Sequence, residues 1–212
     1  MPHIVLLGDS IFDNAAYVRP GEPDVVHQLR ARLPAGAKAT LAAVDGATAA
    51  DVRRQLERLP AGATHLIVSA GGNDALGNIG VLDEPAGSIA DALTRLADIG
   101  GDFERAYRAM LRAVLDCGKP TALCTIYEPR YPDPRLQRLA VTGLALFNDV
   151  ITRAAFTHGL PVLDLRLVCD EDADFANPIE PSAQGGDKIA AAIARLVAEH
   201  DFGRRRSELF VR

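Results

Sequence analysis

Tryptophan is absent from the chain, and aromatic residues make up only 5% of it. Proteins that stack sugars or single-stranded nucleic acids use exposed aromatic rings to do so, so this composition argues against both kinds of surface. The formal net charge of −5 gives no overall field that attracts nucleic acid. The basic run at residues 204–206 has no interleaved aromatic residues and is interpreted as a solvated tail. We therefore expect no nucleic-acid partner.

Long apolar runs are also missing, and cysteines are few. No run approaches the about 20 residues that a transmembrane helix needs. The N-terminus has no basic region followed by an apolar segment and a cleavage site. The three cysteines, Cys117, Cys124 and Cys169, fit no disulfide framework or zinc motif. We expect a cytoplasmic protein with no membrane span.

The usual motifs of cofactor and metal sites are absent as well. The sequence contains no Gly-x-Gly-x-x-Gly string, no Gly-Lys-Ser/Thr string and no His-Glu-x-x-His string. We therefore expect no cofactor and no bound metal. The oligomeric state is left open.

The chain does contain a regular alternation of apolar patterns. Its 212 residues are 48% hydrophobic, which suits one globular domain over residues 1–212. Nearly continuous apolar runs predict buried strands at residues 4–7, 39–44, 66–70, 121–126 and 161–165. Helical patterns occupy residues 24–33, 48–59, 103–117, 135–158 and 182–200. This alternation predicts a three-layer α/β/α fold with a five-stranded parallel sheet in the flavodoxin-like order 2-1-3-4-5.

Polar residues follow the first three predicted strands directly. They lie in the blocks 8–10, 45–48 and 71–74. The carboxyl ends of parallel strands share one edge of the sheet, where open α/β sheets bind ligands. Taken singly, Ser10 has the ordinary interpretation of a helix cap and Asn73 that of a turn residue. Asp9 is interpreted as orienting the turn around Ser10.

Together with residues 177–182, these blocks resemble the SGNH (GDSL-type) hydrolase family over essentially the whole chain. The string Gly8-Asp9-Ser10-Ile11-Phe12-Asp13-Asn14 resembles that family's first block, which implies that Ser10 is the nucleophile. The resemblance also implies an oxyanion hole made by the Ser10 N–H, the Gly46 N–H and the Asn73 amide. A glycine at position 46 lets the backbone approach a substrate closely.

The sequence departs from this family in its last block. Where the family carries Asp-x-x-His, the chain carries Asn177 and Glu180, and none of its five histidines lies in this block. The paired change preserves one negative charge. We expect the Asn177 amide to donate to one oxygen of the Glu180 carboxylate, while the Ser10 hydroxyl donates to the other.

The strength of this base depends on its surroundings. An unperturbed glutamate has a pKa of about 4.3, about two units below that of histidine. Donated hydrogen bonds and the N-terminus of the last helix would lower the pKa further, whereas burial would raise it. The sequence leaves this balance open.

The resemblance implies a serine esterase or acylhydrolase that acts on a small-molecule ester through an acyl-enzyme on Ser10, with Glu180 as an atypical base. The alternative is a non-catalytic module that binds an acyl or carbohydrate ligand in an inactive site. Two long connections, residues 75–101 and 127–134, leave the carboxyl ends of strands, and residues 89–99 of the first have a helical pattern. We expect both connections to wall a pocket.

Overall fold

The structure, a computed structural model, describes residues 1–211 and is built on a six-stranded parallel sheet. The strands are β1 (His3–Gly8), β2 (Lys38–Leu41), β3 (His65–Ser69), β4 (Thr121–Cys124), β5 (Val162–Leu163) and β8 (Leu209–Phe210). Their order is β2-β1-β3-β4-β5-β8. The predicted α/β class and the order 2-1-3-4-5 are therefore confirmed. The predicted number of five strands is wrong, because β8 adds a sixth strand beside β5. A two-residue strand is too short to leave a periodic signal in the sequence.

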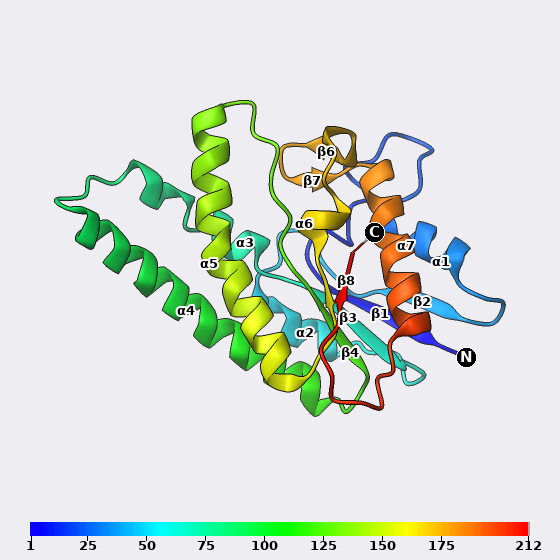
Figure 1. Cartoon of the computed structure of the whole chain (residues 1–212). Coiled ribbons are helices and arrows are strands. Elements are labelled where there is room, and N and C mark those ends of the chain that lie inside the picture. Colours follow the sequence, from blue (N-terminus) through cyan, green and yellow to red (C-terminus); the bar gives the residue numbers. More distant parts are fainter. Residues whose placement is uncertain (212) are drawn as a thin grey trace.

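Apolar side chains cover both faces of this sheet. Because successive side chains of a strand point to opposite faces, Ile4 and Leu6 of β1 join one apolar cluster, whereas Val5 and Leu7 join the other. The first cluster includes side chains of α1 (Val25–Arg32), α6 (Leu165–Val168) and α7 (Ala183–Glu199). The second includes those of α2 (Val52–Leu56), α4 (Ile89–Asp116) and α5 (Pro134–His158). Figure 1 shows the resulting three layers.

The connection over residues 75–101 is mostly helical, so more of it is helix than the pattern expected over residues 89–99. It contains the end of α3 (Gly72–Leu76), the 3₁₀-helix η2 (Ile79–Asp83) and the first part of α4. The α4 helix begins after Ser88, whose side chain accepts a hydrogen bond from the Asp91 N–H. It continues through Gly100 and Gly101, because an interior glycine costs a helix only about 1 kcal/mol and α4 is held by its buried side chains.

The last block of the sequence forms a small antiparallel ribbon. The strands β6 (Phe175–Asn177) and β7 (Glu180–Pro181) pair with each other, between the 3₁₀-helix η3 (Asp172–Asp174) and α7. The Ser182 side chain then caps α7 by accepting from the Gly185 N–H. This ribbon carries Glu180 and Asn177.

One helix of the described chain, α5, has the length and apolar composition of a membrane span. Its buried residues, which include Phe147, Val150 and Ile151, belong to the apolar cluster on the sheet, as in a core helix of a folded domain. The absence of a membrane span stays a prediction.

The sheet requires a glycine at the end of β1. Gly8 has a φ of +128°, and a Cβ atom there would lie 1.6 Å from the carbonyl oxygen of Ser69. We expect Gly8→Ala to lower the free energy of unfolding by about 3 kcal/mol or more, through strain and the clash between β1 and β3. Chemical denaturation measures this change. Gly100→Ala is the control, because its Cβ would meet nothing within 4 Å. Equal midpoints for Gly8→Ala and the parent protein would contradict the prediction.

Candidate active site

Ser10, Asn73 and Glu180 line one cavity at the carboxyl edge of the sheet. Ser10 directly follows the turn that ends β1, Asn73 lies in the first turn of α3 after β3, and Glu180 begins β7. Residues that are far apart in the sequence therefore meet where the strand-end pattern predicted. Gly46 and Asn177 do not line this cavity.

The turn that presents Ser10 is fixed by its neighbours. The Gln55 side chain accepts from the Gly8 N–H and donates to the Gly8 carbonyl, both at 2.8 Å. The Asp9 N–H donates to the Ser69 carbonyl at 3.2 Å, and Asp9 Oδ1 accepts from the Ile11 N–H at 3.2 Å. These contacts hold the backbone on both sides of Ser10 and fit the interpretation of Asp9 as the residue that orients this turn.

Asn73 is joined to the loop that contains Gly46. Its Nδ2 atom donates to the Ala47 carbonyl at 3.1 Å, which leaves the second hydrogen of that amide available. Gly46 has a φ of +78°, a conformation that favours glycine. Among residues 1–211, the N–H groups of Gly46 and Ser10 donate to no protein acceptor. The loop between β2 and α2 is thereby positioned beside the start of α3.

The carboxyl group of Glu180 is nearly buried, because its residue is only 7% exposed. Burial raises the pKa of Glu180 from 4.5 to about 7, and the charge of Asp45 raises it further, whereas the interaction with the Ser10 side chain lowers it. Within the described chain, Glu180 Oε2 has no hydrogen-bond partner. The sequence left open whether burial or hydrogen bonding controls the pKa of Glu180. In the structure the effect of burial is the larger one.

The expected hydrogen bond from Asn177 to the Glu180 carboxylate is not formed, which corrects that prediction. Asn177 Oδ1 instead accepts from the backbone N–H groups of Ile179 and Glu180, each at 3.0 Å. Its side chain is exposed and shapes the tight turn between β6 and β7, as short polar side chains commonly do. Asn177 thus positions the backbone of Glu180 and leaves its carboxylate untouched.

Tyr127 contacts the same turn and was missed as a site residue by the sequence analysis. Its hydroxyl donates to the Ile179 carbonyl at 2.5 Å, and the Arg130 N–H donates to the Pro178 carbonyl at 2.7 Å. Both residues belong to the connection 127–134. The prediction that this connection walls a pocket was the only sign in the sequence that they belong to the site. Their bonds fix the ribbon that carries Glu180.

No histidine lines the cavity in the described part of the chain. His200 is hydrogen-bonded to Glu208, and His3 to Thr40. His65 packs against Phe202. Glu180 is therefore the cavity's candidate proton acceptor, at the position where the resembled family carries a histidine.

A second carboxyl group, that of Asp9, lines the same cavity. Asp9 is only 2% exposed, and burial raises its pKa from 3.8 to about 8. The pKa of Asp9 thus lies above that of Glu180, so Glu180 loses its proton first as the pH rises. Over residues 1–211, no group of three or more His, Cys, Asp or Glu side chains could hold a metal ion.

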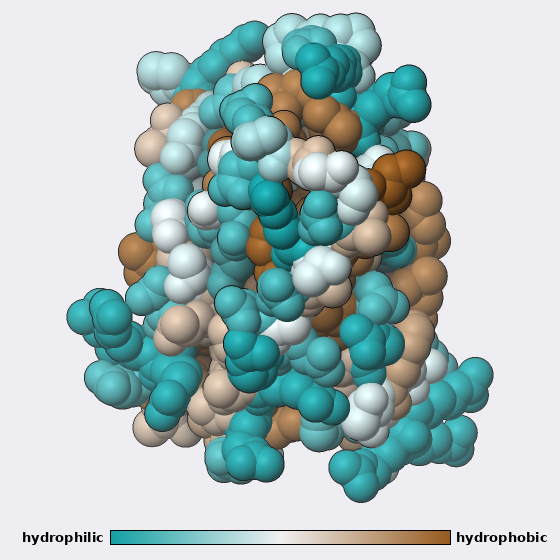
Figure 2. Space-filling model, turned by 90° about the vertical axis from the view of Figure 1, so that its left-hand side faces the viewer, coloured by the Kyte–Doolittle hydropathy of each residue, from teal (hydrophilic) through white to brown (hydrophobic). Residues whose placement is uncertain are grey.

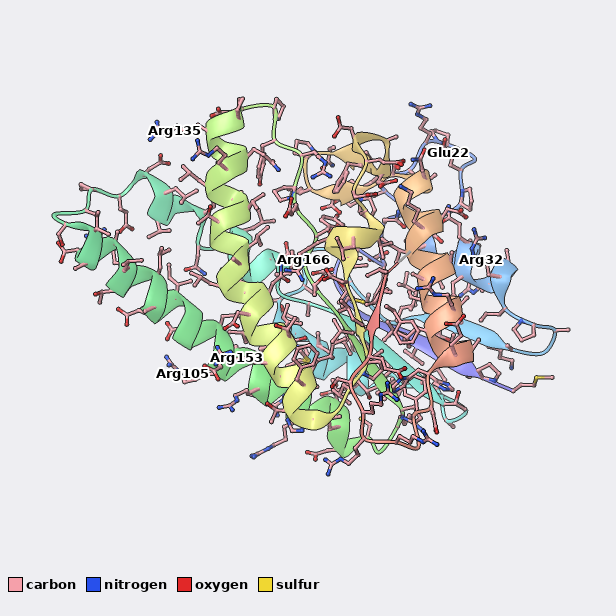
Figure 3. The ribbon with its side chains drawn as sticks, in the orientation of Figure 1. Glu22, Arg32, Arg105, Arg135, Arg153 and Arg166 are labelled. Atoms are coloured by element: carbon pink, nitrogen blue, oxygen red, sulfur yellow. The ribbon has the colours of Figure 1, made fainter. Side chains whose placement is uncertain are left out.

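The whole cavity has an empty volume of about 1040 Å³, including space open to solvent, and most of its other lining residues are apolar. Both predicted connections contribute to it, with residues such as Leu76 and Ile79 from one and Tyr127 and Tyr131 from the other. The α5 helix forms a further wall that the sequence analysis did not predict. Among the charged residues of α5, Arg135 and Arg153 project outward in Figure 3.

Three solved structures with similar folds are hydrolases by their descriptions. An extracellular lipase from Streptomyces rimosus gives a TM-score of 0.65 at 17% identity, covering 95% of this chain and 100% of the lipase. A psychrotrophic esterase from Pseudoalteromonas sp. gives 0.64 at 19% identity, covering 94% and 100%. Phospholipase A1 from Streptomyces albidoflavus gives 0.65 at 15% identity, covering 94% and 99%. At these identities the likeness concerns the fold alone.

No curated protein sequence matches the chain. A sequence model of the GDSL-like lipase/acylhydrolase family, however, matches residues 6–200. This match includes the strands β2 to β5, Ser10, Asn73 and the ribbon that carries Glu180. The chain therefore belongs to the GDSL-like lipase/acylhydrolase family.

Proposed function

We propose that this protein is a serine esterase or acylhydrolase that uses Ser10 as its nucleophile and Glu180 as its base. The observation that carries the proposal is the nearly buried Glu180 carboxyl, which interacts with the Ser10 side chain and has its pKa raised to about 7. A general base works best when its pKa lies near the operating pH. Burial thus brings the pKa of a carboxyl group close to the pKa of an unperturbed histidine side chain.

In the proposed reaction, Ser10 Oγ attacks the carbonyl carbon of the ester as its proton passes to the Glu180 carboxylate. The oxyanion that forms accepts hydrogen bonds from the Ser10 N–H and from the free amide hydrogen of Asn73. The Gly46 N–H is the third proposed donor: Gly46 lies outside the cavity lining, but its loop is tied to Asn73 through the Ala47 carbonyl. The tetrahedral intermediate then collapses, the Glu180 carboxyl protonates the leaving alkoxide, and an acyl-enzyme remains. Water hydrolyses this ester by the same steps, and Ser10 regains its proton.

The charges in the cavity support this assignment. Because the pKa of Asp9 lies above that of Glu180, Glu180 ionises before Asp9 does and supplies the single negative charge that the ordinary Asp–His pair would supply. A base of pKa 4.5 would lose about 1.4 kcal/mol of driving force for each unit below the working pH. The raised pKa of Glu180 removes most of that loss.

The likeness to a phosphonate-inhibited enzyme suggests a probe for the nucleophile. The similar esterase from Pseudoalteromonas sp. was solved in a form inhibited by monoethylphosphonate. A phosphonate is attacked as an ester is, and it leaves a stable bond on the attacking oxygen. We propose that Ser10 of this chain reacts with phosphonates in the same way.

Two substitutions test the assigned roles. We expect Ser10→Ala and Glu180→Gln each to lower kcat/KM for p-nitrophenyl esters by about 10²–10⁴-fold, because each removes one partner of the proton transfer. Glu199→Gln is the control, since Glu199 is exposed at the end of α7. Steady-state hydrolysis measures the change. Full activity of Glu180→Gln would contradict the assigned base, and tight ligand binding without turnover at any pH would indicate the non-catalytic alternative.

The pH dependence tests the state of Glu180. Only the ionised carboxylate accepts a proton, so we expect kcat/KM to rise as the pH rises through about 7 and to level off above it. Asp45→Asn removes a charge that raises this pKa, and the midpoint should move to lower pH. Asp187→Asn removes a half-exposed carboxylate of α7 that pairs with Arg32 of α1, and it should leave the midpoint unchanged. A midpoint near the ordinary glutamate value of about 4.3 would contradict the role of burial.

A further inference from the structure

The apolar part of the cavity is bounded by one face of α5. The residues of this face recur three or four positions apart along the helix, which places them in one stripe. They are Leu139, Ala140, Gly143, Leu144 and Phe147. The opposite wall comes from α3, η2 and the amino-terminal half of α4, which lie beside α5 in Figure 1. Figure 2 shows this side of the molecule, where apolar residues appear in recesses between polar ones.

Gly143 lies in the middle of this stripe, and neither the backbone nor the packing requires a glycine there. It sits inside the 25-residue helix α5, where glycine is less favourable than alanine. Its φ is not positive. A Cβ atom at this position would meet no heavy atom within 4 Å. The missing side chain therefore leaves space, and that space is part of the cavity.

We propose that Gly143 is a specificity-determining residue that opens the pocket beside Ser10 to an unbranched acyl chain of medium length, such as octanoyl. This inference rests on the proposed function, because it names the acyl group that Ser10 would receive. The chain would lie along α5 between Gly143 and the side chains of Leu82 and Leu96, which line the same cavity. Each methylene buried there should raise kcat/KM about fourfold.

A second helical glycine provides a matched control. Gly100 lies inside α4, its φ is not positive, and a Cβ there would also meet nothing within 4 Å. Unlike Gly143, it does not line the cavity. Substitutions at the two positions should affect their helices alike, so any difference in substrate preference reports on the pocket.

The test compares p-nitrophenyl acetate, butanoate, octanoate and dodecanoate as substrates of the parent protein, Gly143→Ala, Gly143→Leu and Gly100→Leu. We expect the parent protein to favour octanoate over acetate. Gly143→Leu should lower the octanoate-to-acetate ratio of kcat/KM by about tenfold or more, and Gly143→Ala by less. Gly100→Leu should leave the ratio unchanged. If Gly143→Leu does not fold, Gly143→Ala alone carries the test. A parent preference for acetate, or a ratio unaffected at position 143, would overturn the inference.

A binding measurement separates this inference from the proposed function. In the Ser10→Ala background, methyl octanoate should raise the Tm more than methyl acetate does, because a ligand stabilises the form that binds it. Adding Gly143→Leu should abolish this difference, whereas adding Gly100→Leu should preserve it. If Gly143→Leu abolishes the difference in Tm but the parent protein has no esterase activity, the acyl pocket is supported and the proposed function is refuted. If the parent protein has esterase activity but Gly143→Leu leaves the difference in Tm unchanged, only the assignment of the acyl pocket is refuted.

Discussion

Burial of a carboxyl group beside a serine hydroxyl is the interaction on which the site depends. Glu180 is held there by the backbone, since Asn177 closes the turn before it and the Tyr127 hydroxyl binds that turn from the neighbouring connection. The carboxylate itself receives no orienting amide. Its position and its raised pKa both follow from the rigid ribbon and the apolar wall around it, so the same burial that opposes ionisation makes the group a base suited to neutral pH.

The base of the ribbon is anchored by a buried ion pair. Lys188 on α7 contacts the carboxylate of Asp174 at 2.9 Å, and Asp174 is fully buried. The Asp174 carbonyl also accepts from the Ser182 N–H at 2.8 Å, and it lies so close to Gly185 that a Cβ there would clash at 2.1 Å. An uncompensated buried charge is costly, so Lys188 and Asp174 keep η3, β7 and α7 in one arrangement that fixes Glu180.

The sequence predicted the parts of this protein that follow from local pattern. Continuously apolar strands and alternating helices determined the sheet and its order, and the strand ends brought Ser10 and Asn73 to one edge. The two-residue strand β8 has no pattern to detect. The role of Asn177 depends on which of its amide atoms faces the turn, which the sequence does not show. The pKa of Glu180 depends on how deeply its carboxyl group is buried, which is set by tertiary packing. The wall formed by α5 arises from tertiary packing alone.

The most direct test of the account is the rate at which a fluorophosphonate labels Ser10, followed by intact mass. This reaction needs the nucleophile and its base but no particular acyl pocket. We expect one phosphonyl group on the parent protein, none on Ser10→Ala, and labelling of Glu180→Gln that is slower by about 10²–10⁴-fold. Labelling of Glu180→Gln at the rate of the parent protein would show that Glu180 takes no proton from Ser10 and would contradict the account.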